Sequence, residues 1–218
     1  MLAGMGKAEQ RQRDKARTQA NAAERRRVVL KVLQGCDEAG ARKLAQLAAT
    51  GVVASCAAGC SHCCRLEIPV TRAEGEVLVG WLREHRTAEE LDAIRATLRG
   101  WLAWYRTELP ALPMSRVDAF FRHAPSCALL EEGRCSAYEA RPITCRNHFV
   151  SSPASECDPA SGGGEPDAML AVAQATYDHV VELRRTIERQ GGNYLATVHL
   201  LPEWLAHLLE VEPEPWAG

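Results

Sequence analysis

Residues 56–64 read CAAGCSHCC, which places four cysteines within nine positions. Two explanations compete for such a cluster, namely disulfide bonds and a bound metal. Adjacent cysteines such as Cys63 and Cys64 rarely bridge each other, because the disulfide torsion strains the peptide between them. The compartment in which the chain resides therefore bears directly on how this region is held together.

The N-terminal stretch MLAGMGKAEQRQRDKARTQANAAERRR is polar and basic. A secretory signal would instead show an apolar run after a short basic region. No stretch approaches the ~18 uncharged apolar residues of a membrane span, so we expect no membrane partner. We predict a cytoplasmic protein with reduced thiols, and clustered thiols in that compartment indicate metal or catalysis.

Charge is unevenly distributed along the chain. Residues 1–31 hold nine Lys/Arg against three Asp/Glu, although the whole chain has a formal net charge of −2. We interpret residues 1–27 as a basic N-terminal arm or helical leader, 28–212 as a single helical domain and 213–218 as a tail. A basic arm could touch nucleic acid, but no aromatic side chains interleave with its arginines for base stacking, so we expect no nucleic-acid partner.

Helical patterns flank the cysteine cluster. Apolar positions recur at helical spacing from about residue 24 to 49: Val29, Val32, Leu33, Cys36, Leu44 and Leu47. We place Cys36 in the core of this stripe, where cysteine behaves as a small hydrophobe. Two capping boxes, Thr71 with Glu74 and Thr87 with Glu90, start two further helices. Pro110 ends the second of them.

The rest of the chain alternates irregular and helical stretches. Residues 110–165 are rich in Pro, Cys, Ser and Gly and show little periodicity, so something besides apolar burial must order them. A helix is expected from Pro166 to Gly191, and a short one after Pro202. We find no convincing sheet and interpret Trp81, Trp101 and Trp104 as packing residues. The predicted fold class is mainly α, a small helical domain with a long cysteine-rich region organised by metal.

Eight cysteines follow Cys36 and fall into two groups of four, separated by the two capped helices. They are Cys56, Cys60, Cys63, Cys64, Cys127, Cys135, Cys145 and Cys157. Zinc and iron–sulfur clusters both take four thiolates per centre, so eight suit two centres, or one centre with spare thiols nearby. Eight unliganded core thiols would instead require apolar periodicity that these segments lack. The region 56–157 is therefore our candidate metal site.

The spacing favours an iron–sulfur cluster of the 4Fe–4S type over Zn²⁺. Three thiolates in CxxxCxxC can converge on three corners of a cuboidal cluster, whereas zinc knuckles usually show paired CxxC motifs. The adjacent Cys63 and Cys64 point in different directions and are expected to serve different metal atoms or centres. His62 could be a ligand, but we expect it to be exposed or to support the ligands.

Arginines lie between the later cysteines. Four thiolates on zinc or on an oxidised 4Fe–4S cluster leave about two excess negative charges. Arg141 and Arg146 flank Cys145 and could offset these, because arginine stays charged and has five donors. We place both as candidate cofactor-binding residues, with surface solvation as the alternative. Gly133 should form a turn that brings Cys127 and Cys135 together.

The motif CxxxCxxCC followed by C…GxCxxYexRPxxCR resembles the zinc- or iron-chelating cysteine-cluster proteins, also called YkgJ-like. The resemblance covers residues 56–157, and Tyr138 and Pro142 match besides the cysteines, Gly133 and both arginines. Cys157 matches less securely, because it follows a variable loop. The resemblance implies metal chelation through these cysteines without a settled reaction. The same cluster occurs in flagellin lysine N-methylases.

Two functional hypotheses follow. In the first, the protein binds metal for electron transfer, metal handling or structure, with a protein redox partner where electrons move. In the second, it is an iron–sulfur enzyme that uses S-adenosylmethionine for methyl transfer. CAAGCSHC has the spacing of radical S-adenosylmethionine enzymes, and GGEP at 163–166 echoes their cofactor motif. Those enzymes are β/α barrels, whereas this chain predicts helices and loops, so we favour the first. No catalytic residue is identifiable.

Overall fold

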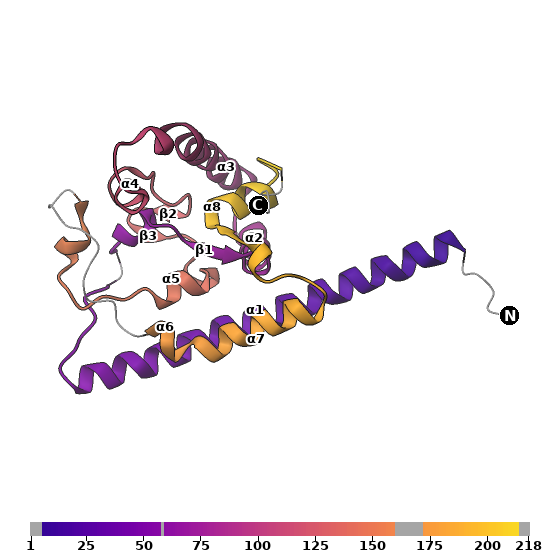
Figure 1. Ribbon diagram of the computed structural model, residues 1–218, viewed down its shortest axis with the longest axis horizontal. Helices are drawn as coiled ribbons and strands as arrows, with labels where there is room; N and C mark the ends of the chain where they lie inside the picture. Colours follow the sequence, from indigo (N-terminus) through magenta and orange to yellow (C-terminus); the bar gives the residue numbers. More distant parts are fainter. Residues whose placement is uncertain (1–5, 58, 160–171, 214–218) are drawn as a thin grey trace.

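The computed structural model describes residues 6–57, 59–159 and 172–213, and it is mainly helical, as predicted (Figure 1). The α-helices are α1 (Lys7–Ala49), α2 (Arg72–His85), α3 (Ala88–Ala103), α4 (Arg116–His123), α5 (Ile143–Asn147), α6 (Val172–Ala175), α7 (Tyr177–Arg189) and α8 (Leu201–Leu208). The strands are β1 (Pro69–Thr71), β2 (Leu130–Glu131), β3 (Arg134–Cys135) and β4 (Val198–Leu200). Within these described ranges, no helix combines the length and apolarity needed to cross a membrane.

Helix α1 packs lengthwise against α7 (Figure 1). Val29, Val32 and Leu33 of the predicted stripe are buried, whereas Leu44 and Leu47 at its end are only partly buried. Cys36 is only 1% exposed, which confirms its place in the core. They meet apolar side chains of α7 and of the N-terminal half of α2, namely Leu183, Ile187, Ala73 and Val77. Because this contact is apolar and continuous, the burial of apolar surface is the main contribution that stabilises the packing of α1 against α7.

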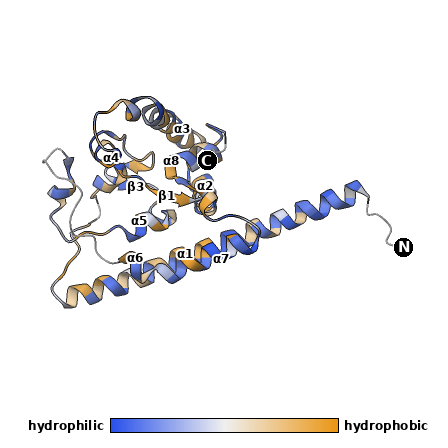
Figure 2. Ribbon diagram, viewed as in Figure 1, coloured by the Kyte–Doolittle hydropathy of each residue, from blue (hydrophilic) through white to orange (hydrophobic). Residues whose placement is uncertain are grey.

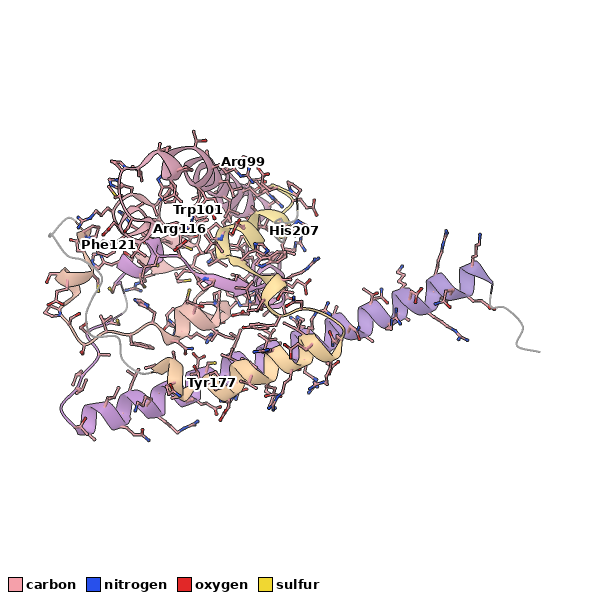
Figure 3. All side chains as sticks on the ribbon, in the orientation of Figure 1. Arg99, Trp101, Arg116, Phe121, Tyr177 and His207 are labelled. Carbon is pink, nitrogen blue, oxygen red and sulfur yellow. The ribbon has the colours of Figure 1, made fainter. Side chains whose placement is uncertain are left out.

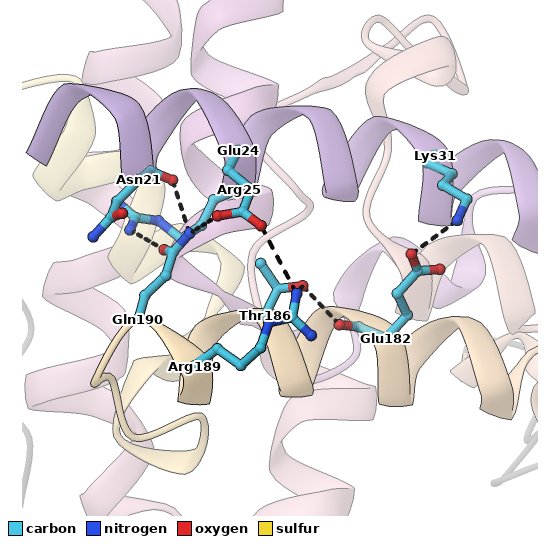
Figure 4. Close-up of polar contacts among 8 residues, drawn as sticks. All are labelled: Asn21, Glu24, Arg25, Lys31, Glu182, Thr186, Arg189 and Gln190. Carbon is cyan, nitrogen blue, oxygen red and sulfur yellow. Dashed lines mark hydrogen bonds and ion pairs between the residues drawn. The ribbon is translucent and has the colours of Figure 1, made fainter. Parts of the chain in front are cut away.

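Polar side chains border the same contact (Figure 4). Arg25 Nη1 donates to Gln190 Oε1 at 2.7 Å, and Gln190 Nε2 donates to Glu24 Oε2 at 2.8 Å. About two turns further along, Lys31 Nζ lies 2.8 Å from Glu182 Oε1. Before these contacts, the first turns of α1 extend beyond the body and are hydrophilic (Figures 1 and 2). The helix thus begins well before the apolar stripe that identified it.

Both predicted capping boxes are present. Thr71 Oγ1 accepts from Glu74 N at 3.2 Å while Glu74 Oε2 accepts from Thr71 N at 2.9 Å, which fixes the start of α2. Thr87 and Glu90 make the same pair of bonds at the start of α3. Helices α2, α3 and α8 then enclose the largest core cluster, around Leu78, Leu82, Leu98, Trp204 and Leu205.

The expectation of no sheet is wrong in detail. β1 pairs antiparallel with β4, and β2 pairs antiparallel with β3. Each strand has only two or three residues, which is too short to leave an alternating pattern in the sequence. These ladders nevertheless matter, because β1 leads from the cysteine motif into α2 and β3 carries Cys135.

Helix α4 was also missed, inside the stretch predicted to be irregular. Ser115 caps it by accepting from Asp118 N at 3.1 Å. Its Phe120 ring lies 5.2 Å from Trp104 and 6.3 Å from Trp101, between centroids. Trp101 (Figure 3) and Trp104 are both buried and are thus packing residues, as expected. Figure 3 labels Trp101 alone of the two. With only eight residues, this helix offered too little periodicity to be seen.

The helix expected from Pro166 cannot be followed from its start, because Pro166 lies outside the described residues. Within them, α6 and α7 follow each other across Thr176, and Gly191 at φ +80° comes just after α7, as predicted. The GGEP stretch at 163–166 also lies outside the described residues. A short helix at Pro202 is confirmed as α8.

Two glycines on α2 provide a matched test of the packing between α2 and α8. A Cβ on Gly75 would lie 3.0 Å from Leu208 Cδ1 and 3.2 Å from Trp204 Cβ, whereas one on Gly80 would meet nothing within 4 Å. We expect Gly75→Ala to destabilise the protein by about 1 kcal/mol, because a fixed core must shift. Gly80→Ala should stabilise it by up to about 1 kcal/mol through helix propensity. Denaturant unfolding measures both, and equal effects would contradict the close approach.

Candidate metal centre

The eight cysteines after Cys36 come from four stretches of chain. Cys56 and Cys60 lie on the loop after α1, and Cys63 and Cys64 on a 3₁₀ turn, His62–Arg65. Cys127 precedes the β2–β3 hairpin, and Cys135 lies in β3. Cys145 is in α5, and Cys157 ends a second 3₁₀ turn, Ala154–Cys157. All are partly buried and none forms a disulfide, whereas Cys36 lies apart in the core.

A main-chain hydrogen bond joins the end of the first motif to the second group. Cys127 N donates to Cys64 O at 2.8 Å. Cys127 O in turn accepts from Leu130 N at 3.0 Å, and Leu130 pairs with Cys135 across the hairpin. Because these contacts are made by the backbone, they place the three cysteines together independently of the thiols.

The hairpin turn has the conformation predicted from its glycine. Glu132 and Gly133 both have positive φ, at 48° and 76°, which is the two-residue turn that suits a tight hairpin. A Cβ on Gly133 would lie 3.5 Å from Gly59 O, so the turn also approaches the loop of Cys60. The turn therefore sets the spacing between Cys127 and Cys135.

A different set of bonds holds the start of the first motif. Ser55 N donates to Val150 O at 2.9 Å, and Val150 N donates to the sulfur of Cys56 at 3.4 Å. Ser55 Oγ also donates to Ser152 O. The loop after α1 thus runs beside the segment that leads to Cys157, as Figure 1 shows. Nothing in the sequence singled out Ser55 for this contact.

His62 completes the contact with that segment. Its Nδ1 lies 4.0 Å from Asp158 Oδ1, so the residue before Cys63 pairs with the residue after Cys157. This geometry fits the expectation that His62 supports the ligands.

The thiols affect one another electrostatically. Burial raises the pKa of Cys127 to about 11, and the nearby Cys135 and Cys63 add to the rise. Burial also raises the pKa of Cys145, followed by the effects of Cys127, Cys63 and Cys135. The pKa of Cys63 is raised first by its side-chain hydrogen bond with Cys64 and then by burial. A metal cation that binds here must therefore displace protons from these thiols.

The two arginines have different surroundings. Arg141 lies over the Tyr138 ring at 3.8 Å, and its charge opposes the rise in the pKa of Cys63, Cys135 and Cys145. Its buried Nε has no hydrogen-bond partner among the described residues. A buried donor beside thiols suits a thiolate or sulfide acceptor, so this part of the site fits a thiolate-bound metal group.

The guanidinium of Arg146 instead donates hydrogen bonds to oxygen atoms of the protein. Its side chain is 4% exposed, and it donates to Arg141 O at 2.8 Å, to Glu139 O and to the carboxylate of Asp37. It thereby ties the turn before Cys145 to α1. Asp37 follows Cys36 directly, but no pattern in the sequence indicated its pairing with Arg146.

The thiols gather without forming a finished coordination sphere. Across residues 6–57, 59–159 and 172–213, no three Cys, His, Asp or Glu side chains already stand as a metal-binding group. The backbone contacts bring together stretches that carry cysteines. Ligand roles for the eight cysteines, Arg141 and Arg146 therefore remain predictions.

We expect Arg146→Lys to destabilise the protein by about 2 kcal/mol, because one ammonium cannot span three acceptors on two elements. The turn before Cys145 should loosen, and metal retention should fall. Thermal unfolding and metal analysis after dialysis measure the two effects. Arg134→Lys, at an exposed position of the hairpin, is the matched control. Full stability with full metal retention in Arg146→Lys would refute the positioning role.

Comparison with known proteins finds a family model that matches part of the chain. Residues 55–161, about half of the chain, match the model of the CxxCxxCC family, described as "Putative zinc- or iron-chelating domain". No curated protein and no solved structure matches the chain. The chain has three residues between Cys56 and Cys60, one more than the family name indicates. The resemblance drawn from the motif is thus confirmed, because the family model matches the same cysteine region.

Proposed function

We propose that this protein uses the eight cysteines after Cys36 to bind iron–sulfur clusters, with Zn²⁺ as the alternative, and that it carries electrons or handles metal. The observation that carries the proposal is that backbone hydrogen bonds hold the CAAGCSHCC stretch against two other cysteine-bearing segments, at Cys64–Cys127 and at Ser55–Val150. The family match supports zinc or iron chelation and leaves the kind of metal open.

Two features favour iron–sulfur over zinc. The first is the CxxxCxxCC motif, whose close thiols suit neighbouring corners of a cuboidal cluster better than the paired knuckles of zinc sites. The second is the buried Nε of Arg141, which has no partner among the described residues and lies beside the thiols. Hydrogen bonds to sulfur are one of the means by which proteins tune iron–sulfur clusters.

The cysteines, Arg141 and Arg146 would have different roles at the metal site. The cysteines would hold the metal, Arg141 would donate toward sulfur and offset negative charge, and Arg146 would hold the turn before Cys145. When bound, an iron–sulfur cluster supplies a reversible one-electron couple. Partial burial of the thiols limits the access of water to the site. A soluble redox protein would then be the partner.

The described residues favour this role over radical S-adenosylmethionine chemistry. Their only sheets are two antiparallel ladders of two strands each, so these residues do not build the β/α barrel on which that chemistry is found. No observation on the described residues favours methyl transfer.

The first test is the content of metal and acid-labile sulfide in protein purified without oxygen. We expect iron with sulfide and broad visible charge-transfer absorption. Zinc without sulfide would contradict the iron–sulfur proposal and point to a structural or metal-handling site. Absence of both metals from the full chain would overturn metal binding altogether.

Single variants of the same protein test the ligands. Cys60→Ser and Cys145→Ser should lower the metal content and increase protease cleavage within residues 110–165. Cys36→Ser is the matched control and should keep the metal, because Cys36 is packed in the core against α7 and α2. Unchanged metal content in the first two variants would contradict their assignment.

The role of Arg141 is tested by the reduction potential. Arg141→Gln should lower the midpoint potential, because a reduced cluster carries one more negative charge and loses a nearby cation. Arg99→Gln, at an exposed position of α3, makes the same change in net charge and should leave the potential unchanged. An equal shift in both variants would show that only the overall charge matters.

A further inference from the structure

A cavity of about 510 Å³ lies outside the cysteine region. Its walls come from β1, the start of α2, α5, the α6–α7 stretch and the chain between α7 and β4. This volume is within the range of about 300–1,000 Å³ that small-molecule sites occupy. None of the residues that line the cavity is a cysteine, so it is a separate place in the fold from the candidate metal centre.

The lining of the cavity is mostly apolar. Val70 of β1, Ile143 of α5 and Val180 of α7 contribute aliphatic side chains to it. Tyr177 and Tyr194 add two aromatic rings. Tyr177 is 61% exposed on α7 (Figure 3), so its ring stands where the cavity opens to solvent. Such walls suit a ligand with a hydrocarbon body, because the ligand removes apolar surface from water when it binds.

The buried polar group in this apolar wall is the carboxylate of Glu74, which is 6% exposed. Oε2 accepts from Thr71 N and from Thr71 Oγ1, whereas Oε1 accepts from Ile143 N alone among the described residues. An ionised carboxylate has about four acceptor sites, so one site on Oε1 is left for a donor from a ligand. The three internal donors hold the carboxylate in place before any ligand arrives.

The charges of the lining select the ligand. None of the residues described in the lining is lysine or arginine, and besides Glu74 only His148 among them can carry a charge near neutral pH. The nearby Arg146 donates to Asp37, and Arg184 of α7 pairs with Glu188. An anionic ligand would therefore meet Glu74 as a like charge, whereas a cation would find an opposite charge and two aromatic rings.

We propose that this cavity binds a small primary amine with an aliphatic body. The ammonium group donates to Glu74 Oε1, and the hydrocarbon chain packs against Val70 and Val180, with Tyr177 at the opening. The pairing offsets the cost of removing the ammonium charge from water, which an apolar cavity without a carboxylate could not do. This site is independent of the proposed metal function, and a chain without metal would leave it untouched.

Three ligands of one chain length test the charge selection on the full protein at neutral pH. Hexan-1-amine, hexan-1-ol and hexanoate share the same hydrocarbon body and differ in the head group. We expect the amine to bind about tenfold more tightly than the alcohol, because a charged hydrogen bond replaces a neutral one. Hexanoate should bind least. Isothermal titration calorimetry measures all three, and equal affinities for amine and alcohol, or no saturable binding of the amine, would overturn the proposal.

Variants locate the binding in this cavity. Glu74→Gln removes the charge but keeps a residue that suits the capping box, so amine affinity should fall to that of the alcohol. Tyr177→Ala leaves the cap intact and should weaken amine binding about threefold through loss of the ring. Val117→Ala, at a 53% exposed position of α4 outside the lining, is the control and should bind normally.

Circular dichroism confirms that each variant folds. If Glu74→Gln does not fold, Tyr177→Ala and the ligand series still decide the question. Full amine affinity in Tyr177→Ala, or an equal loss in Val117→Ala, would show that the amine binds elsewhere on the chain and would refute the assignment to this cavity.

Discussion

The structure depends on a buried carboxylate that joins the helical body to the cysteine region. Glu74 Oε2 accepts from Thr71 N and Oγ1 at the start of α2, and its Oε1 accepts from Ile143 N at 3.0 Å. Burial raises the pKa of Glu74, and these hydrogen bonds oppose that rise. A carboxylate so enclosed is held by three donors, none of which water could readily replace. Ile143 begins α5, so the same group that caps α2 also fixes the helix that carries Cys145.

The cysteine region shows why a helical protein can contain a long segment with little secondary structure. Apolar burial is concentrated in the α1–α7 contact and in the α2–α3–α8 core, and both lie outside the cysteine loops. The loops are ordered by individual hydrogen bonds, such as those of Ser55 with Val150 and of Cys127 with Cys64. Each such bond contributes only about 1 kcal/mol. Metal–thiolate bonds contribute far more to folding, so loss of metal should loosen these loops before the helices.

Local patterns in the sequence were sufficient to predict features in which a residue interacts with its neighbours along the chain. The Thr71–Glu74 and Thr87–Glu90 boxes and the turn at Gly133 depend on residues within about one helical turn, and all were predicted. The burial of Cys36 was predicted from its place in the apolar helical stripe, although the residues that cover it come from other helices. Contacts between residues that are far apart in the sequence were not predicted. Asp37 with Arg146, His62 with Asp158 and Glu74 with Ile143 join segments tens of residues apart. No local pattern in the sequence indicates such pairs, because the two partners lie in separate segments. The eight cysteines were identified by composition, but their grouping in space was not.

The spread of the cysteines along the chain has a consequence for assembly. Backbone hydrogen bonds join the CAAGCSHCC stretch to Cys127 and Val150, so the cysteine region is not assembled until these distant segments have returned to it. Loop closure over such distances costs entropy, which the backbone bonds at Ser55 and Cys64 reduce before metal binds. Metal loading would therefore follow folding of the helical body, and Glu74, which places α5 on that body, would act before any thiolate does.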